Sequence, residues 1–399
     1  MDKRPCSLYL STIAHKSLNQ SCAQRNTLKQ QPFFFSVMKR EEIQMKWLIY
    51  SGLAAAAFVL PSFGSGQELA SRNASKQPSP PPFDADLYRR DVQVFSLQGE
   101  FLYWRVQEGA LDYALSMKEN GWGPSQCYAQ GNFKNATFNG DPGFRAALKF
   151  FRAPRYWEFW TQYTRLTARG TNTAGKPSPD GEYLTGTWPQ MFVNPMASAK
   201  SYIHLNYNVA DLFITRVFYP NPHLRLRCIG GAVVAWIDQF WKVLYSDWAS
   251  FQTKIANRWS FIGGGLKIGT TFDWYWFSDI YMTGGANFGT LIGSYQNSSR
   301  QTTNYQPNAA FNPSLPVRDA HLSDVRPTFQ AQFYLGPSYQ KNFPNQRLEI
   351  FAGYEVVAWL NLQEIYHSTN GGPSDAKETW INTSALALQG LTARVSLDF

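Results

Sequence analysis

The last nine residues of the chain alternate between apolar and polar side chains. Leu391, Ala393, Val395, Leu397 and Phe399 are apolar, and each residue between them is polar. Because successive side chains of a β-strand point to opposite faces, this pattern predicts a strand with one apolar and one polar face. Chain ends usually fray unless something holds them. A terminal strand of this kind is typical of a closed barrel, in which it pairs with the first strand.

The same two-faced pattern recurs between residues 92 and 399. Val92–Trp104 places apolar side chains on one parity and polar ones on the other, and its length is sufficient to cross a bilayer. Phe329–Leu335 and Leu348–Leu360 repeat the pattern. Tyr156–Thr164 is aromatic on both parities, so its faces cannot be assigned from the sequence. We therefore expect an antiparallel barrel over residues 92–399.

The breaks between the predicted strands have two lengths. Short turns lie at Ala153–Arg155, Tyr219–Pro222, Phe277–Asp279 and Phe343–Asn345, and longer breaks lie at Gln107–Asp141, Ala168–Ala199, Ser246–Ala256, Gln296–Val325 and His367–Thr383. Short periplasmic turns and long extracellular loops are typical of a transmembrane barrel. The predicted fold is all-β: a transmembrane antiparallel up-and-down β-barrel of about 10 strands. If Ala110–Met117 forms a separate hairpin arm, the count becomes 12.

The first 91 residues lack this alternation. Lys46 precedes the apolar run Trp47–Leu60, which has the length of a secretory signal core and is too short to span a bilayer. We expect the true translation start to be Met38 or Met45. Residues 1–37 are then either a leader that was wrongly assigned to the protein or an unstructured tail. Residues 38–66 are then a cleaved signal peptide, and residues 67–91 a Pro-rich periplasmic linker. A cytoplasmic tail followed by a buried helix is the alternative.

Composition agrees with a barrel. Aromatic residues make up 16% of the chain, with 14 Trp and 21 Tyr, and such residues form the interfacial girdles of barrels. The mean hydropathy of −0.35 excludes a bundle of membrane helices. The net charge of +9 falls to +4 when residues 1–66 are removed. No basic run with interleaved aromatic residues remains, which argues against nucleic-acid binding.

Neither cysteine nor histidine spacing points to a cofactor. Cys127 and Cys228 remain after removal of the leader, and an oxidising periplasm would permit a bond between them. Two free or separately paired thiols fit the sequence equally well. The four remaining histidines show no metal-ligand spacing. The Gly263–Gly265 run matches no nucleotide-binding fingerprint and is better explained as room for neighbouring side chains or for sharp curvature.

Five short segments precede the terminal strand in a distinctive order and spacing. They are Gly99-Glu-Phe-Leu-Tyr-Trp104, Glu108-Gly-Ala-Leu-Asp-Tyr113, Phe138-Asn-Gly-Asp-Pro-Gly-Phe-Arg145, Tyr207-Asn-Val-Ala-Asp-Leu212 followed by Arg216, and Trp236-Ile-Asp238. Together they resemble the Legionella- and chlamydia-type major outer-membrane proteins. The resemblance implies outer-membrane residence, a diffusion pore, and recognition of the terminal strand by the outer-membrane assembly machinery. Chlamydial members cross-link the envelope through abundant cysteines, a role that two cysteines do not fit.

Charged residues on the polar parity are expected to face the lumen, because a charge on the lipid face costs about 2–4 kcal/mol near the midplane. The candidate lumen-lining residues are Glu100, Arg145, Lys149, Arg225, Arg227, Lys267, Asp273, Arg347, Glu349, Glu355, Arg394 and Asp398. Such charges would set the selectivity of a pore. They could instead pair across strands and fill a narrow lumen, since small barrels are packed. The expected barrel-assembly signal is Leu391, Val395, Leu397 and Phe399.

The function expected from these features is that of a porin-like outer-membrane protein through which small solutes diffuse passively. The expected partners are outer-membrane lipid, the assembly machinery, and small polar solutes or ions, with no cofactor. One alternative is an adhesin or structural surface protein that uses its long loops. Another is a rim-located hydrolase, for which His321, flanked by Asp319 and Asp324, is the best available candidate. We do not expect an enzyme.

Overall fold

The computed structural model describes residues 93–118, 131–152, 156–176, 182–187, 196–247, 251–304, 316–368 and 379–399. The expected leader (1–37), signal peptide (38–66) and linker (67–91) lie outside the described residues, as do Cys127 and the turn at Ala153–Arg155. In the described ranges every regular element is a β-strand. No helix among these residues is long and apolar enough to cross a membrane.

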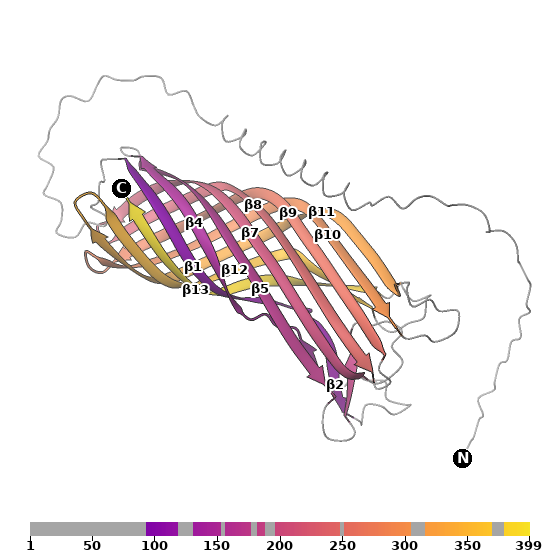
Figure 1. Ribbon diagram of the computed structural model, residues 1–399. Helices are drawn as coiled ribbons and strands as arrows, with labels where there is room; N and C mark the ends of the chain where they lie inside the picture. The colour runs from indigo at the N-terminus through magenta and orange to yellow at the C-terminus, as the bar shows by residue number, and fades with distance from the viewer. Residues whose placement is uncertain are drawn as a thin grey trace, which may run out of the picture. The chain divides into compact units, whose positions relative to one another are not determined.

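Within the described residues, ten long strands close into one antiparallel ring (Figure 1). The ring runs β1-β13-β12-β11-β10-β9-β8-β7-β5-β4 and returns to β1. The strands are β1 (Val94–Glu108), β4 (Gly140–Arg152), β5 (Trp157–Gly175), β7 (Met196–Asn221), β8 (Leu224–Asp247), β9 (Gln252–Tyr275), β10 (Ile280–Thr303), β11 (Arg318–Asn342), β12 (Arg347–Ser368) and β13 (Thr379–Asp398). The predicted fold class is therefore confirmed.

The ring closes where the first strand meets the last. β1 pairs with β13 in a register that places Glu100 opposite Arg394. At the end of this seam the backbone N–H of Phe399 donates to the carbonyl of Phe95 at 2.8 Å. The chain end is thus held by ladder hydrogen bonds, and the predicted pairing of the terminal strand with Val92–Trp104 is confirmed.

Three short strands extend the sheet without joining the ring. β2 (Asp112–Lys118) pairs with β3 (Gly131–Asn135) and with β6 (Glu182–Gly186), and β6 touches β7 through Leu184 and Met196. The chain leaves β1 at Ala110, whose φ of 58° is left-handed. Ala110–Met117 therefore contributes a separate arm, and the ring in the described part of the chain keeps ten strands rather than twelve.

The two ends of the barrel differ in how the strands connect. At one end, the turn end, β7–β8, β9–β10 and β11–β12 join through short connections at the predicted positions. At the other, the loop end, strands run further than predicted. β9 already begins at Gln252, β10 continues to Thr303, and β11 begins at Arg318, all inside segments expected to be loops. The outward-facing residues of these strand extensions are polar. Because loops are also rich in polar residues, these segments were predicted to be loops.

Towards the turn end, apolar side chains cover the outside of the barrel. These side chains, which we call the lipid belt, include Phe95, Leu97, Phe101, Leu212, Ile214, Leu266, Ile268, Phe329, Phe333, Leu335, Leu391 and Val395, and each is more than 40% exposed. On the inside of the same segments lie buried charges such as Glu100, Lys267 and Glu355. An apolar outside and a polar inside suit a barrel surrounded by lipid.

Towards the loop end, the arrangement reverses. An apolar core fills the inside, and its largest members, Trp104, Trp241, Trp259 and Trp359, are at most 1% exposed. The outer face carries polar and basic side chains, including Arg169, Lys200, Lys254 and Arg300. We call this part of the barrel the projecting half, because its outer surface suits water and its core is that of a water-soluble barrel.

Glycines of β9 and β10 make room for this core. A Cβ atom on Gly263 would lie 2.5 Å from the ring of Phe261, and one on Gly293 would lie 2.7 Å from the same ring. Gly263 has the inward parity of Phe261, and Gly293 on β10 is directly opposite Gly263. The Gly-rich segment therefore accommodates a neighbouring aromatic side chain, as the sequence predicted.

Candidate functional site

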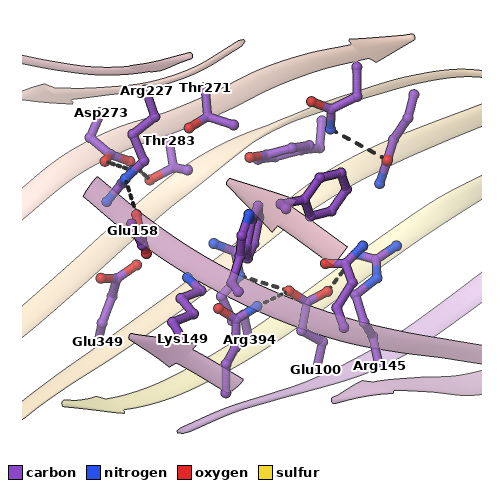
Figure 2. A pocket seen from close by; sticks show the side chains of 17 residues that line it. Glu100, Arg145, Lys149, Glu158, Arg227, Thr271, Asp273, Thr283, Glu349 and Arg394 are labelled. Atoms are coloured by element: carbon purple, nitrogen blue, oxygen red, sulfur yellow. Dashed lines mark hydrogen bonds and ion pairs between the residues drawn. The ribbon is translucent and has the colours of Figure 1, made fainter. Parts of the chain in front are cut away.

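A cluster of buried charges fills the lumen inside the lipid belt (Figure 2). Arg145 on β4 donates through Nη1 to Glu100 Oε2 at 2.6 Å and through Nη2 to Glu355 Oε1 at 2.8 Å. Arg394 on β13 donates through Nε to the other oxygen of Glu100 at 2.9 Å. The two arginines and two glutamates thus alternate in sign, and the Arg145–Glu355 contact crosses the lumen between strands that are not neighbours in the ring.

Neutral side chains complete the hydrogen bonding of this cluster. Gln332 Nε2 donates to Glu355 Oε1 at 2.6 Å, and Thr392 Oγ1 donates to Glu355 Oε2 at 2.9 Å. Arg145 Nε donates to Thr164 Oγ1 at 2.9 Å. The Arg145 guanidinium also lies 5.5 Å from the ring centre of Trp104, where the charged lumen meets the apolar core. Buried charges with this many partners are held in one arrangement.

A second group of charges lies nearer the turn end. Asp273 on β9 accepts hydrogen bonds from Arg225 Nε at 2.7 Å, from Arg227 Nη1 at 2.5 Å and from Thr283 Oγ1 at 2.8 Å. Arg227 also pairs with Glu158 on β5 at 3.5 Å. Figure 2 shows Glu158, Arg227 and Asp273 pointing toward one another from different strands. This group therefore ties β5, β8, β9 and β10 together.

Two further ion pairs and one aromatic pair surround these groups. Lys267 Nζ lies 3.5 Å from Asp211 Oδ1, and Arg347 Nε donates to Asp398 Oδ2 at 2.6 Å. Tyr275 stacks on Tyr281 with ring centres 4.5 Å apart. Both rings are buried at the turn end of the lumen, and the guanidinium of Arg225 lies 5.7 Å from the centre of the Tyr275 ring.

The space left between the charges is small. The charge-lined cavity in the belt half has a volume of about 40 Å³, room for only a few water molecules. Four acidic and four basic side chains contribute to its lining: Glu100, Glu158, Asp273, Glu349, Arg145, Lys149, Arg227 and Arg394. The formal charges of these eight side chains sum to zero.

The structure places the side chains of all the predicted lumen residues on the inner face. Glu100, Arg145, Arg225, Lys267, Asp273, Arg347, Glu349, Glu355 and Asp398 are buried, and Lys149, Arg227 and Arg394 are half-buried. Arg394 and Glu100, both predicted to face the lumen, lie 2.9 Å apart across the closing pair of strands. The predicted assembly-signal residues Leu391, Val395, Leu397 and Phe399 lie on the outer face, and three of them are exposed.

Two acidic residues of the lumen, Glu158 and Asp211, were not among the residues predicted to line it. Glu158 lies in the segment whose aromatic residues on both parities concealed its faces. Asp211 lies next to Leu212, which with Ile214 is exposed on the lipid belt. Leu212 and Ile214 share one parity of the strand, and Asp211 has the other. This alternation could have identified Asp211 as a residue that faces the lumen.

A polar group also lies inside the projecting half. Glu108, at the end of β1, accepts hydrogen bonds from Gln239 Nε2 at 3.0 Å and from Gln363 Nε2 at 2.9 Å. It lies five residues beyond Tyr103, the last exposed apolar residue of β1, and so outside the lipid belt. Burial raises the pKa of Glu108 to about 8, and the hydrogen bond from Gln239 opposes this rise.

The predicted rim residues assemble only in part. His321 Nε2 lies 3.0 Å from Asp319 Oδ1, and both side chains are exposed on the outer face of the projecting half. Asp324 has the opposite parity and pairs with Arg326 at 2.7 Å. Asp324 therefore lies apart from the pair formed by His321 and Asp319. In the ranges that the structure describes, no three His, Cys, Asp or Glu side chains are grouped to hold a metal ion.

Residues 91–399 match the family model described as Legionella pneumophila major outer membrane protein precursor. No curated protein matches the chain. The outer membrane protease OmpT from Escherichia coli has a TM-score of 0.35 and 9% identity, over 77% of this chain and 96% of that chain. A FadL homologue from Pseudomonas aeruginosa has a TM-score of 0.23 and 10% identity, over 77% and 90%. The Pseudomonas putida toluene transporter TodX has a TM-score of 0.18 and 6% identity, over 77% and 89%. Structural similarities at this level carry no argument about activity.

Proposed function

Because the chain belongs to the family of the Legionella pneumophila major outer membrane protein, we propose that it is an outer-membrane surface protein with a closed barrel. In this proposal the barrel holds a rigid β-structured projection outside the membrane. The observation that carries it is the reversal of polarity along the strands, with the lipid belt in one half and a polar outer face over an apolar core in the other.

The filled lumen supports a closed barrel. A solute path would have to pass both the paired charges and the apolar core around Trp241 and Trp359. Separating Arg145 from its two glutamates would leave buried charges unpaired, which costs on the order of 3–5 kcal/mol. The cavity of about 40 Å³ has no room for a solute larger than a few water molecules.

The connections at the two ends support the direction of insertion. Short turns of outer-membrane barrels lie in the periplasm, so we place the turn end there together with Phe399. The projecting half then stands at the cell surface. At about 3.3 Å per residue, the strands reach roughly 20–30 Å along their length beyond the belt. Export through a signal peptide at residues 38–66 belongs to this proposal.

A narrow diffusion pore for small polar solutes or ions is the second candidate. Eight charged side chains around a polar cavity favour it. The two candidates differ in one measurable property, because only the pore predicts ionic conductance through the purified protein.

Conductance in planar lipid bilayers tests the proposal. We expect no steps above the lipid background, under conditions in which a wide-lumen porin gives regular steps. Reproducible steps would overturn the closed barrel and favour the pore. In that event Glu100→Ala and Lys267→Ala should each alter ion selectivity, since each removes one sign of charge from the lumen.

Surface labelling tests the direction of insertion. Ser298→Cys on the projecting half and Gln346→Cys at the turn end would be compared in a background lacking Cys127 and Cys228. A membrane-impermeant maleimide added to intact cells should label Ser298→Cys, and should label Gln346→Cys only after lysis. The reverse pattern would overturn the placement of the projecting half at the cell surface.

A further inference from the structure

Four positively charged residues surround one small residue on the outer face of the projecting half. Ala256 on β9 is opposite Lys242 of β8 on one side and opposite Arg300 of β10 on the other. Lys254 and Arg258 lie two residues before and after Ala256 on β9. Because side chains two residues apart on a strand share a face, all four charges lie around Ala256. We call this group the cation ring.

The spacing of the cation ring is that of immediate neighbours in a sheet. Directly opposite residues lie about 4.5–5.5 Å apart and diagonal ones about 7–8 Å apart. Lys242 and Arg300 are each diagonal to both Lys254 and Arg258. All four side chains are at least partly exposed. Four charged residues therefore surround one small residue, Ala256, on this part of the outer face.

The cation ring itself contains no carboxylate, and two carboxylates border it on the same face. Asp319 is directly opposite Arg300 but pairs with His321 at 3.0 Å, and Asp238, opposite Ser260, is diagonal to Arg258. The residues opposite Lys254 are Leu244 and Thr302, and those opposite Arg258 are Phe240 and Ser298. Among the described residues, no ion pair connects any of the four cations to an acid; Lys242 instead lies 5.9 Å from the ring centre of Tyr202. Like charges on neighbouring strands repel one another. A bound anion would relieve this repulsion, and a phosphate group suits it because it accepts hydrogen bonds from both arginine and lysine.

The height of the cation ring indicates where that phosphate comes from. Exposed Phe240 lies two residues before Lys242, and Ile262, the last outward apolar residue of β9, lies four residues after Arg258. With a rise of about 3.3 Å per residue and a strand tilt of 35–45°, Arg258 stands roughly 10 Å above Ile262. This is beyond the hydrocarbon and at the level of a large polar head group.

We propose that the cation ring binds the phosphorylated sugar head group of a glycolipid in the leaflet around the projecting half. The inference rests on the proposed function, which places this half at the outer surface. The four cations bind phosphate, and exposed Phe240, directly opposite Arg258, lies beside them at the level of the head group. Such binding would fix the depth of the barrel in the leaflet.

The test measures binding of bisphosphorylated lipid A to the full barrel in detergent, by native mass spectrometry. Dephosphorylated lipid A and inorganic phosphate serve as comparison ligands. We expect lipid A to bind at least about ten-fold more tightly than its dephosphorylated form, because charge-assisted hydrogen bonds would be lost. We expect raised salt to weaken the difference.

Three paired substitutions localise the binding. Lys254→Gln with Arg258→Gln should weaken lipid A binding about ten-fold or more. Lys254→Arg with Arg258→Lys keeps the charge and should stay within about three-fold of the natural chain. Arg152→Gln with Lys341→Gln removes one arginine and one lysine that are exposed at the turn end, and should leave binding unchanged. Heat-dependent gel mobility reports whether each variant forms the barrel.

Three outcomes would overturn the inference. These are unchanged binding in the Gln pair, equal binding of phosphorylated and dephosphorylated lipid A, and inorganic phosphate binding as tightly as lipid A. The last would identify a site for small anions rather than lipid. Binding in detergent depends on neither conductance nor direction of insertion. A failure here is therefore distinguishable from a failure of the proposed function.

Discussion

The belt half and the projecting half are built from the same strands with opposite polarity. In the belt half of β9, Leu266 and Ile268 are exposed outside and Lys267 is buried inside. Further along the same strand, Arg258 is exposed outside while Ile255 and Trp259 are buried inside. The period of two continues unbroken between them. Strand geometry therefore fixes which residues share a face, and the surrounding solvent decides which face is apolar.

The two halves are consequently stabilised in different ways. The projecting half gains stability from apolar area removed from water, about 25 cal/mol per Å². In the belt half the inside holds charges, and Glu100, Arg145, Glu355, Arg225 and Asp273 are tolerated there because they form ion pairs with one another. Matched substitutions in the two halves should thus differ in how strongly they destabilise the barrel.

The largest effect is expected from a charge placed in the apolar core of the projecting half. Ile255→Asp buries a carboxylate among apolar side chains, and should destabilise the barrel by about 5 kcal/mol or more, or prevent folding. Gln252→Asp on the exposed outer face of the same strand, opposite Ser246, is the matched control and should change stability by less than about 0.5 kcal/mol. Urea unfolding in lipid, followed by tryptophan fluorescence, measures both. Equal effects would contradict the reversal of polarity.

Loss of one charge from the belt lumen should rank second. Arg145→Met leaves Glu355 without its ion-pair partner and should destabilise the barrel by about 3–5 kcal/mol in the same assay. Adding Glu355→Gln should restore part of that loss, because Glu100 keeps Arg394. Arg165→Met, on the exposed outer face of β5, is the control and should have little effect. A double variant no more stable than Arg145→Met would argue against the ion pair as the cause.

A charge placed on the outer surface should destabilise the belt half more than the projecting half, but by less than the two substitutions above. Phe333→Arg places a guanidinium in the lipid belt and should cost about 2–4 kcal/mol. Ser323→Arg lies ten positions away on the same face of β11, in the projecting half, and should cost less than about 0.5 kcal/mol. If both variants unfold at the same urea concentration in lipid, Phe333 does not face hydrocarbon.

The smallest effect is a dependence on pH that arises in the projecting half. Glu108 has a pKa of about 8 in the folded barrel, against an ordinary value of 4.5. Between these values the folded state binds a proton that the unfolded state releases, so this residue's contribution to stability falls as pH rises from about 4.5 to about 8. Glu108→Gln should remove that dependence. Because Glu108 is only half-buried and solvent screens it, we expect a gain of about 1–2 kcal/mol at pH 9.

Unfolding measured from pH 4 to pH 9 checks this prediction. The natural chain and Glu108→Gln should have similar stability at pH 4 and diverge as pH rises. Gln363→Ala, which removes one donor to Glu108, is a useful comparison because it leaves the carboxyl group in place. A constant difference between the natural chain and Glu108→Gln across the range would show that Glu108 does not change its charge there.

Much of the structure of the belt half could be predicted from the alternation of apolar and polar residues along each strand. Alternation identified the strands, the closure of the barrel by Leu391–Phe399, and the inward direction of Glu100 and Arg394. It failed in Tyr156–Thr164, where Glu158 lies, because aromatic residues occupy both faces. Aromatic side chains are stable both in lipid interfaces and in barrel interiors, so their position does not reveal which face is which.

The strands of the projecting half were harder to recognise. Segments such as Gln252–Ala256 and Gln296–Thr303 were expected to lie in loops, because their outward residues are polar. Apolar inward residues of these segments, such as Ile255, still alternate with the polar outward residues. A strand with a polar outer face resembles a loop in composition. Only pairing with neighbouring strands distinguishes such a strand from a loop.

The sequence by itself determined the strand period, the closing pair of strands and the inward charges, because each follows from local alternation and from the cost of charge in lipid. Only the tertiary structure decided that Arg145 meets Glu355 across the lumen, that the lumen is filled, and that four cations surround Ala256. These features depend on the register between strands far apart in the chain. Parity within one strand gives the face of a residue, whereas ring closure and register give its neighbours.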